Sequence, residues 1–546
     1  MRFLNFSLCL FVFSFVSVFS EENGSHASKG ESHAIANVTQ GANNETAEEV
    51  PHGAHEVSKD LHGHDEVGGV VDHGPSHGVA DGEEESGHHG VHLQGETVSL
   101  WWIIPFIGIL LSIAILPLVA GHFWHHNYGK VSLFWWACFI VPFTMRHGFD
   151  VSIFYILEVY LGEFIPFIVL LLALFTIAGG VRLKGRLVGT PMVNTGLLLL
   201  GTVLASWMGT TGAAMLLIRP LLKANSWRKY KVHSVVFFIF LVANVGGSLT
   251  PLGDPPLFLG FLKGVSFFWT TTHLFLPMVF VSVILLVVFF IIDTVLYKKE
   301  GKPPVKEANE EAIGLEGTGN LLLLLGVIGA VVLSGIWKKD ITNEADVLFS
   351  AFGTGLMTKG VGLQIMLLLG LTFISLKITK KETRSGNGFT WEPILEVAKL
   401  FATIFMTMVP AIAILKAGTK GALSSVINSV SNADGPINSM YFWATGLLSS
   451  FLDNAPTYVV FFNTAGGDAT QLMKAESEGG MATTLLAISC GAVFMGANTY
   501  IGNAPNFMVR SIAEENDVKM PSFFGYMAWS VGILIPILFL VSLIFF

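Results

Sequence analysis

Long apolar runs alternate with short polar gaps from about residue 100 to the C-terminus. The runs lie at about 100–120, 131–145, 152–179, 192–222, 233–265, 274–296, 319–337, 361–377, 396–416, 438–462, 482–514 and 522–546. Because a membrane-spanning helix needs about 20 mainly apolar residues, the pattern predicts an all-α polytopic membrane protein. The composition agrees, since 52% of the residues are hydrophobic and only 13% are charged.

Two of these runs are interrupted by similar polar segments. The segments read GSLTPLGDPP at 247–256 and GANTYIGNAP at 496–505, with Gly, Thr, Gly and Pro at the same offsets. An unpaired backbone group is costly in lipid, so such a break persists only where protein, water or ions satisfy it. Repeated broken helices of this kind are typical of secondary transporters, where they line the ion or substrate site.

Loop charges predict how the runs are oriented. If the N-terminus is exported and 192–222 forms a re-entrant hairpin, all three basic loops of the first half fall on the cytoplasmic side. The second half, with a hairpin at 438–462, then runs the opposite way. Each half has five spans and one hairpin, which predicts two inverted repeats, 100–296 and 319–546, joined by a cytoplasmic linker at 297–318. Lys338 and Lys339 fall outside against the rule, and we expect a short extra helix at 346–358.

The first 99 residues differ from the rest of the chain. Residues 1–20 have an early Arg2 and an apolar run, which predicts a secretory signal peptide, with an uncleaved anchor as the alternative. Residues 21–99 hold 16 Asp/Glu and two Lys/Arg. Their low apolar content predicts a disordered exported tail.

Histidines cluster in that tail beside carboxylates, a combination that can bind zinc, copper or nickel weakly. The candidate ligands are His52, His55, His62, His64, His88, His89 and His92. Buffering of protons outside the cell is a second reading, and a merely solvated tail is a third. No spacing among these histidines matches a closed structural zinc site.

Ionisable residues at membrane depth are functional candidates by default. Asp254 lies in the first break, and Asp453 lies at the tip of the second hairpin. Carboxylate, amide, hydroxyl and carbonyl oxygens suit a hard cation. The nearby oxygen donors are Thr210, Thr211, Asn244, Ser248, Thr250, Asn454, Asn498, Thr499 and Asn503. The alternative for both aspartates is that each only caps the helix half that follows it.

Three further carboxylates, Asp150, Glu158 and Glu163, are candidates for a proton relay. They could instead pair structurally with Arg146 or His147. The membrane body contains no nucleophile–base pair, phosphate loop or zinc helix motif, so we expect no enzyme activity. Three cysteines are too few for a disulfide framework.

The motifs resemble those of the ion transporter superfamily, which includes NhaD-type sodium/proton antiporters, arsenite efflux permeases and citrate or dicarboxylate transporters. The resemblance rests on NVGGSLTPLGDPP at 244–256, SFLDNAP at 450–456 and GANTYIGNAPN at 496–506, and it is strongest to bacterial Na⁺/H⁺ antiporters. It implies a scaffold domain, a mobile transport domain with two hairpins, and often a homodimer. Dicarboxylate members carry Ser-Asn-Thr at both hairpin tips, whereas the tips here read GTT at 209–211 and DNA at 453–455.

We therefore expect a Na⁺(Li⁺)/H⁺ antiporter of the bacterial inner membrane, in which Asp254 and Asp453 bind either a cation or protons. Its partners would be small inorganic cations and membrane lipid, with no nucleic acid, and it would need no cofactor beyond the transported Na⁺ and H⁺. The alternatives are a sodium-coupled organic-anion (dicarboxylate) symporter, an anion or metalloid efflux permease, and a membrane-bound metal sensor built on the His-rich tail.

Overall fold

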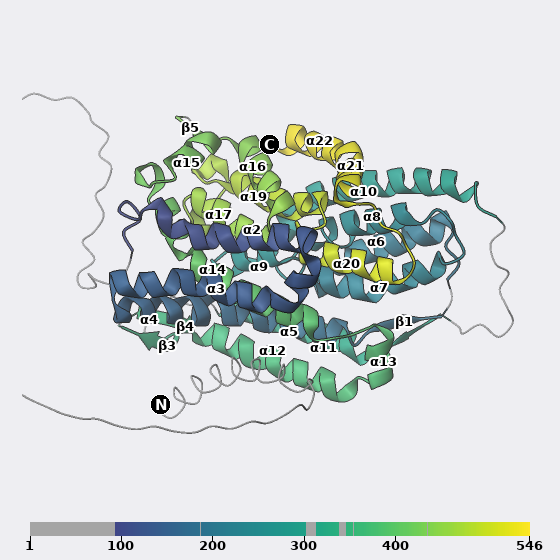
Figure 1. The fold of residues 1–546 in the computed structure, drawn as a ribbon, viewed down its shortest axis with the longest axis horizontal. Helices are drawn as coiled ribbons and strands as arrows, with labels where there is room; N and C mark the ends of the chain where they lie inside the picture. Colours follow the sequence, from purple (N-terminus) through teal and green to yellow (C-terminus); the bar gives the residue numbers. More distant parts are fainter. Residues whose placement is uncertain (1–92, 186, 302–312, 338–344, 353, 434) are drawn as a thin grey trace, which may run out of the picture. The chain divides into compact units, whose positions relative to one another are not determined.

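The computed structural model of this protein is mainly helical in the part that it describes (Figure 1). The structure describes residues 93–185, 187–301, 313–337, 345–352, 354–433 and 435–546. The predicted signal peptide and the seven candidate tail histidines lie outside these residues. Among the described helices, eight are long and apolar enough to cross a membrane, which confirms an all-α polytopic membrane protein.

The first half begins with a group of helices that ends in α5. These are η1 (Leu100–Ile103), α2 (Ile104–Val119), α3 (Gly121–His147), α4 (Phe149–Leu157), the π-helix η2 (Glu158–Phe164) and α5 (Ile165–Ala178). A helical hairpin, a broken helix and a long last helix follow. The hairpin is α6 (Pro191–Met208) and α7 (Thr210–Ala224), and the broken helix is α8 (Val232–Leu241), η3 (Val245–Ser248) and α9 (Pro255–Leu262). The last helix is α10 (Phe267–Tyr297).

The second half repeats this order of elements. Its first group is α11 (Gly319–Ile336), α12 (Lys359–Ile378), α13 (Lys381–Gly386), α14 (Glu392–Lys416), η4 (Gly418–Lys420) and α15 (Ser424–Val430). Its hairpin is α16 (Asn438–Phe451) and α17 (Asn454–Thr464), and the short helices α18 (Ala469–Met473) and η5 (Glu476–Glu478) follow it. The broken helix is α19 (Ala482–Met495), η6 (Gly496–Asn498) and α20 (Ala504–Glu515). The last helix is α21 (Phe523–Trp529), the π-helix η7 (Ser530–Leu534) and α22 (Ile535–Phe545).

The prediction of a short helix at 346–358 was wrong. This segment forms an antiparallel hairpin of β3 (Val347–Ala351) and β4 (Thr354–Thr358). Side chains of β3 alternate between half-buried and exposed, the period of a strand and not of a helix. Two shorter pairs join β1 (Arg182–Lys184) to β2 (Gly314–Glu316) and β5 (Ser431–Asn432) to β6 (Gly435–Pro436).

The tips of the two helical hairpins are built differently. Gly209 separates α6 from α7 with φ +80, a conformation that favours glycine. The second tip uses Asp453, whose Oδ1 accepts a 3.0 Å hydrogen bond from the backbone N–H of Ala455 at the start of α17. That bond is a helix N-cap, so the capping role considered for Asp453 is present.

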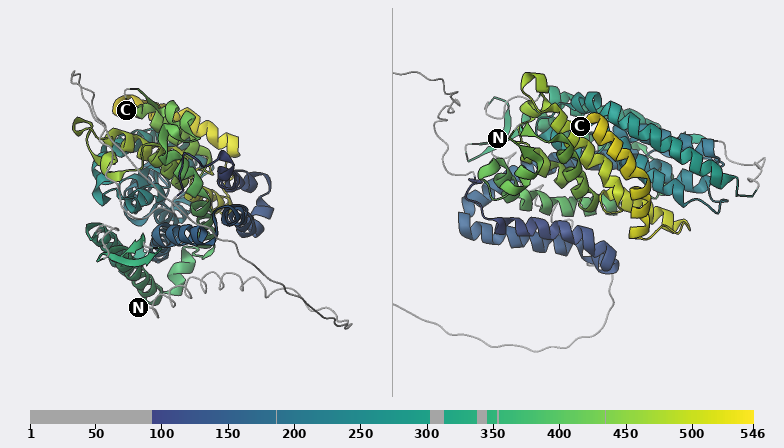
Figure 2. Two further views of the ribbon diagram at one scale, coloured as in Figure 1. Left: turned by 90° about the vertical axis from the view of Figure 1, so that its left-hand side faces the viewer. Right: turned by 90° about the horizontal axis from the view of Figure 1, so that it is seen from above.

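Each broken helix ends beside the hairpin of the other half. The second segment of the first broken helix, α9, packs on α17, while its counterpart α20 packs on α7. Figure 1 shows α20 alongside α7, and Figure 2 shows the C-terminal helix α22 beside α10, which it also contacts. This exchange brings the two breaks and the two hairpin tips, which are far apart in sequence, into one region.

A buried ionic cluster lies at the base of the first hairpin. The Asp293 carboxylate on α10 is 2.6 Å from Nη1 of Arg228 and 2.8 Å from Nε2 of His233, and it accepts a 2.9 Å bond from Nδ2 of Asn194. Asn194 also exchanges hydrogen bonds with Asn225 at the end of α7. The cluster thereby ties both arms of the hairpin to α8 and α10.

Candidate functional site

Matching hydrogen bonds attach each break to the hairpin of its own half. The Thr250 hydroxyl donates to the carbonyl of Ser206, and the Thr499 hydroxyl donates to the carbonyl of Ser450. Each threonine also accepts from the backbone N–H two residues later, both at 3.2 Å. The repeated Thr in the two sequence segments therefore has a structural cause, since it satisfies backbone groups freed by the break.

The repeated glycines have a steric cause. A Cβ added to Gly253 would lie 2.1 Å from the carbonyl oxygen of Gly247, and one added to Gly502 would lie 2.5 Å from that of Gly496. The chain thus turns back on itself at each break, and only glycine leaves room for that approach.

We expect the substitution Gly253→Ala to destabilise the protein by about 1–3 kcal/mol, because the added methyl meets backbone that cannot rotate away. Equilibrium unfolding in mixed micelles would measure the change. Gly370→Ala on α12 is the matched control, since a Cβ there meets open space. Equal stability of the two variants would contradict the close approach of the two backbone segments.

The side chain of Asp254 is buried and receives three hydrogen bonds from both halves of the chain. Its Oδ2 accepts from Nδ2 of Asn454 at 2.6 Å, and its Oδ1 accepts from Nδ2 of Asn503 at 3.2 Å and from the Thr210 hydroxyl at 3.3 Å. The side chain makes no capping bond to α9, so the capping alternative does not account for its position. A buried carboxylate held by amides and a hydroxyl is suited to accept either a cation or a proton.

The second carboxylate lies next to the first. Asp453 immediately precedes Asn454, its side chain is half-buried, and its charge interacts with that of Asp254. Two interacting like charges, one of them buried, favour a cation or a proton over an anion. Within the described parts of the chain, no Lys, Arg or His side chain pairs with Asp254 or Asp453 to neutralise them.

A chain of amides continues from Asp254 into the second break. Nδ2 of Asn503 also donates to Oδ1 of Asn244 at 3.2 Å, and Nδ2 of Asn244 donates to Oδ1 of Asn506 at 2.7 Å. Asn506 in turn donates to the carbonyls of Gly496 and Thr499. The two breaks are therefore joined directly, through side chains of both halves.

Two buried amide oxygens in this region have no hydrogen-bond donor. Asn454 donates to Asp254 and Asn498 donates to the Ser450 hydroxyl at 2.9 Å, but Oδ1 of each has no partner. Such buried acceptors without a donor are uncommon in proteins, and each is free to accept a further bond. Amide oxygens of this kind are suitable ligands for a hard cation.

Comparison with known protein families also indicates a transport protein. Residues 95–546 match the model of the family CitMHS_2, described as "Putative citrate transport". The chain belongs to this family. Among curated proteins, none matches the chain.

The CitMHS_2 match covers both breaks and both hairpins, so the membrane body as a whole is that of a transporter. The relation to NhaD-type antiporters in particular remains a prediction. No group of three or more His, Cys, Asp or Glu that could hold a metal ion occurs in the described ranges.

The other predicted site residues lie outside the group that contacts Asp254. The Ser248 hydroxyl donates to the carbonyl of Val245, and Thr211 is half-buried at the start of α7. Asp150 is exposed in the first turn of α4, where a carboxylate suits the helix N-terminus. Glu158 and Glu163 line a separate cavity.

Sequence reasoning left three contributors out of the predicted site. Asn506 joins the two breaks, while Ser206 and Ser450 provide the carbonyls that hold the two threonines. The sequence contains a weak signal for the serines, because each is followed by an aromatic residue at the same place in its hairpin. Nothing in the sequence shows which amides face each other.

Proposed function

We propose that this CitMHS_2 family member exchanges a small monovalent cation, Na⁺ or Li⁺, for protons across the membrane. The observation that carries the proposal is the chemistry around Asp254. Asp254 and Asp453 interact, and the amide that donates to Asp254, that of Asn454, has an unsatisfied oxygen, while neither carboxylate has a cationic partner among the described residues. A site of oxygens with excess negative charge suits a hard cation.

Competition at Asp254 is sufficient to couple the two ions. A proton and a sodium ion each neutralise the carboxylate, and both cannot occupy the same oxygen. If the empty, charged site crosses the membrane slowly because of its desolvation cost, each cation moved one way obliges protons to move the other way. The two halves have the same order of helical elements, and the opposite orientations predicted for them from loop charge would provide the usual basis for alternating access.

Sodium-coupled transport of an organic anion is the second candidate. It is favoured by the family description, which names citrate transport. The donors around Asp254 argue against a carboxylate bound in direct contact with this residue, because an anion there would meet like charge without a basic side chain. An anion held elsewhere in the protein, with Na⁺ bound at Asp254, would fit the same geometry.

Everted membrane vesicles from a host without its own sodium antiporters would distinguish the two candidates. For antiport, Na⁺ or Li⁺ alone should collapse a preformed pH gradient reported by a fluorescent dye. For symport, Na⁺ alone should have no effect, and right-side-out vesicles should take up labelled citrate or succinate only with Na⁺. The second outcome would overturn the antiport proposal.

We expect the apparent KM for Na⁺ to fall as pH rises, because a cation binds only the deprotonated carboxylate. The decrease should stop once the site is fully deprotonated. Dye-monitored Na⁺ titrations at several pH values would measure it. An apparent KM that is independent of pH would show that protons and Na⁺ do not compete.

A further inference from the structure

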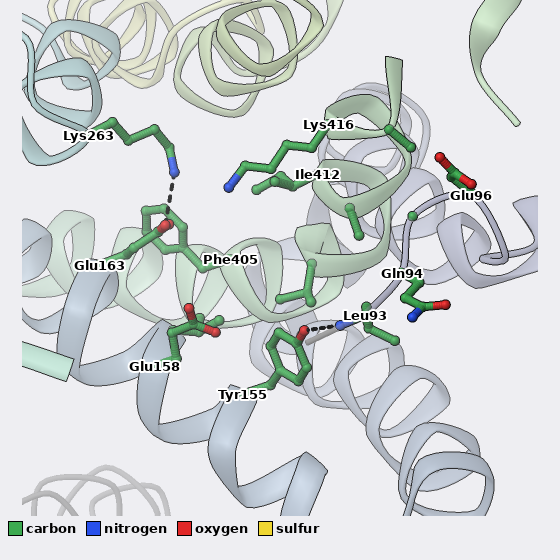
Figure 3. A pocket seen from close by; sticks show the side chains of 15 residues that line it. Leu93, Gln94, Glu96, Tyr155, Glu158, Glu163, Lys263, Phe405, Ile412 and Lys416 are labelled. Carbon is green, nitrogen blue, oxygen red and sulfur yellow. Dashed lines mark hydrogen bonds and ion pairs between the residues drawn. The ribbon is translucent and has the colours of Figure 1, made fainter. Parts of the chain in front are cut away.

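A cavity of about 680 Å³ lies beside the far end of the helix that begins after Asp254. Its wall includes Glu158 and Glu163 of η2, Lys263 directly after α9, and Lys416 at the end of α14. Figure 3 shows that the ammonium groups of Lys263 and Lys416 approach the same space, while both glutamates point into it. Four charged groups from three different helical elements therefore share one cavity.

One ion pair in this cavity connects α9 to the helix group outside the hairpins and breaks. Nζ of Lys263 lies 2.9 Å from Oε1 of Glu163, and the two side chains are 17% and 31% exposed. Because α9 has eight residues, this pair lies about 12 Å along the helix axis from Asp254. Movement of the Asp254 site relative to η2 must therefore change this pair.

The π-helix places a second carboxylate on the same wall. Residues five apart lie nearly above one another in a π-helix because its hydrogen bonds run from i to i+5. Glu158 and Glu163 are five apart and both face the cavity, whereas an ordinary α-helix would direct them to different sides. Glu158 has no ion pair with a described residue, yet its charge interacts with those of Glu163, Lys416 and Lys263, in decreasing order.

A second contact of α9 with this helix group is aromatic. Phe258 stacks on Phe167 of α5 with ring centroids 6.3 Å apart, and Phe167 stacks on Phe401 of α14 at 4.9 Å. Contacts between apolar rings form no hydrogen bonds, so they do not fix α9 at one position along α5. Lys263 is thus the charged side chain by which α9 is fixed relative to η2.

We propose that Lys263 is a positioning residue that exchanges Glu163 for Glu158 when α9 moves along η2 during transport. The cavity gives the ammonium group space to move, and the second carboxylate pairs with it after the step. In each position the ammonium group of Lys263 is paired with one of the two carboxylates, so the lysine is not left as an unpaired charge in either end state. The proposal depends on the protein being a transporter and not on which solute it carries.

Cysteine cross-linking tests the two positions directly. In a variant without the native cysteines, the pairs Glu163→Cys/Lys263→Cys and Glu158→Cys/Lys263→Cys would be oxidised in vesicles with and without a sodium gradient. We expect both pairs to cross-link and the gradient to shift the ratio of the two products. Failure of the pair at 158 and 263 to cross-link under either condition would overturn the proposal, whatever solute is transported.

Charge exchange provides a second, independent test. The double variant Glu163→Lys/Lys263→Glu restores the pair of this structure but places two glutamates together after the step, so we expect transport to slow severalfold. Exchanging all four charges (Glu158→Lys, Glu163→Lys, Lys263→Glu, Lys416→Glu) should restore the transport rate that the double variant loses. Lys263→Arg, which keeps the charge, should transport faster than Lys263→Gln, which removes it.

The pair of Arg510 and Glu514 on α20, which lies outside this cavity and is 24% and 44% exposed, provides the control, since exchanging these two charges should leave the rate unchanged. A double variant at 163 and 263 that transports at the wild-type rate would show that Glu158 has no part in the cycle. So would a folded four-charge variant that is no faster than the double variant.

Discussion

Replacing Asp254 with Asn should abolish sodium-dependent proton movement in everted vesicles. The amide has nearly the same shape, but it can neither take up a proton near neutral pH nor neutralise a bound cation. The donors that now face the carboxylate, from Asn454, Asn503 and Thr210, would lose their charged acceptor. The expected loss is therefore of exchange itself and not only of affinity, so high Na⁺ should not restore it.

A folding defect can be separated from this effect. Asp517→Asn is the matched control, since Asp517 is exposed with φ +58, a conformation that asparagine also tolerates. Both variants should elute from size exclusion as the wild type does. Persistent Na⁺-dependent proton movement in a well-folded Asp254→Asn variant would remove Asp254 from the mechanism and with it the antiport proposal.

Asp453→Asn tests the second carboxylate without disturbing the fold. Asparagine is as good an N-cap as aspartate, so the hydrogen bond to Ala455 should survive while the charge is lost. A change in transport would then come from the charge. If Asp453 only caps α17, this variant should transport like the wild type.

The sequence predicts the helical architecture well because lipid imposes strict requirements. Apolar runs, two matched breaks and two hairpins all follow from the cost of unpaired backbone groups in a bilayer. The hairpin of β3 and β4 was missed because this segment lies outside the apolar runs, where that requirement does not act. A short stretch with both strand and helix formers, such as 346–358, is decided by its packing against the rest of the chain.

The composition of the site was easier to predict than its contacts. Asp254, Asn454 and Asn503 are conspicuous as polar residues within apolar runs, but their hydrogen bonds join segments about 200–250 residues apart, as when Asn454 bonds Asp254 across 200 positions. Such pairings depend on how α9 and α20 pack beside the opposite hairpins, which a hydropathy pattern does not encode.

The ionic cluster at the base of the first hairpin shows a different limit. Arg228 belongs to a basic loop that the positive-inside rule assigns to the solvent. In the structure its side chain is fully buried, where it pairs with the carboxylates of Asp293 and Glu300 and donates to Oδ1 of Asn225. Loop charge locates the side of the membrane but does not distinguish a surface cation from a buried one.

Replacing Asp293 with Ala should destabilise the protein by about 3–5 kcal/mol, the usual cost of leaving one charge of a buried ion pair without its partner. Arg228 would keep a buried positive charge with only the more distant carboxylate of Glu300, 3.8 Å from its Nε, and Asn194 would lose an acceptor. Equilibrium unfolding in mixed micelles would measure the loss. Lys229→Gln, on the exposed neighbour of Arg228, should change stability by less than about 0.5 kcal/mol.

The double variant Arg228→Met/Asp293→Leu separates the cost of an unpaired charge from the loss of the cluster as a whole. Because replacing both buried charges with apolar groups is often neutral, this variant should be more stable than Asp293→Ala. Its remaining deficit would measure the contribution of the bonds from His233 and Asn194. A double variant less stable than Asp293→Ala would contradict this expectation. It would show that the hydrogen bonds of the cluster, and not only the pairing of its two charges, contribute to the free energy of unfolding and hold the hairpin to α8 and α10.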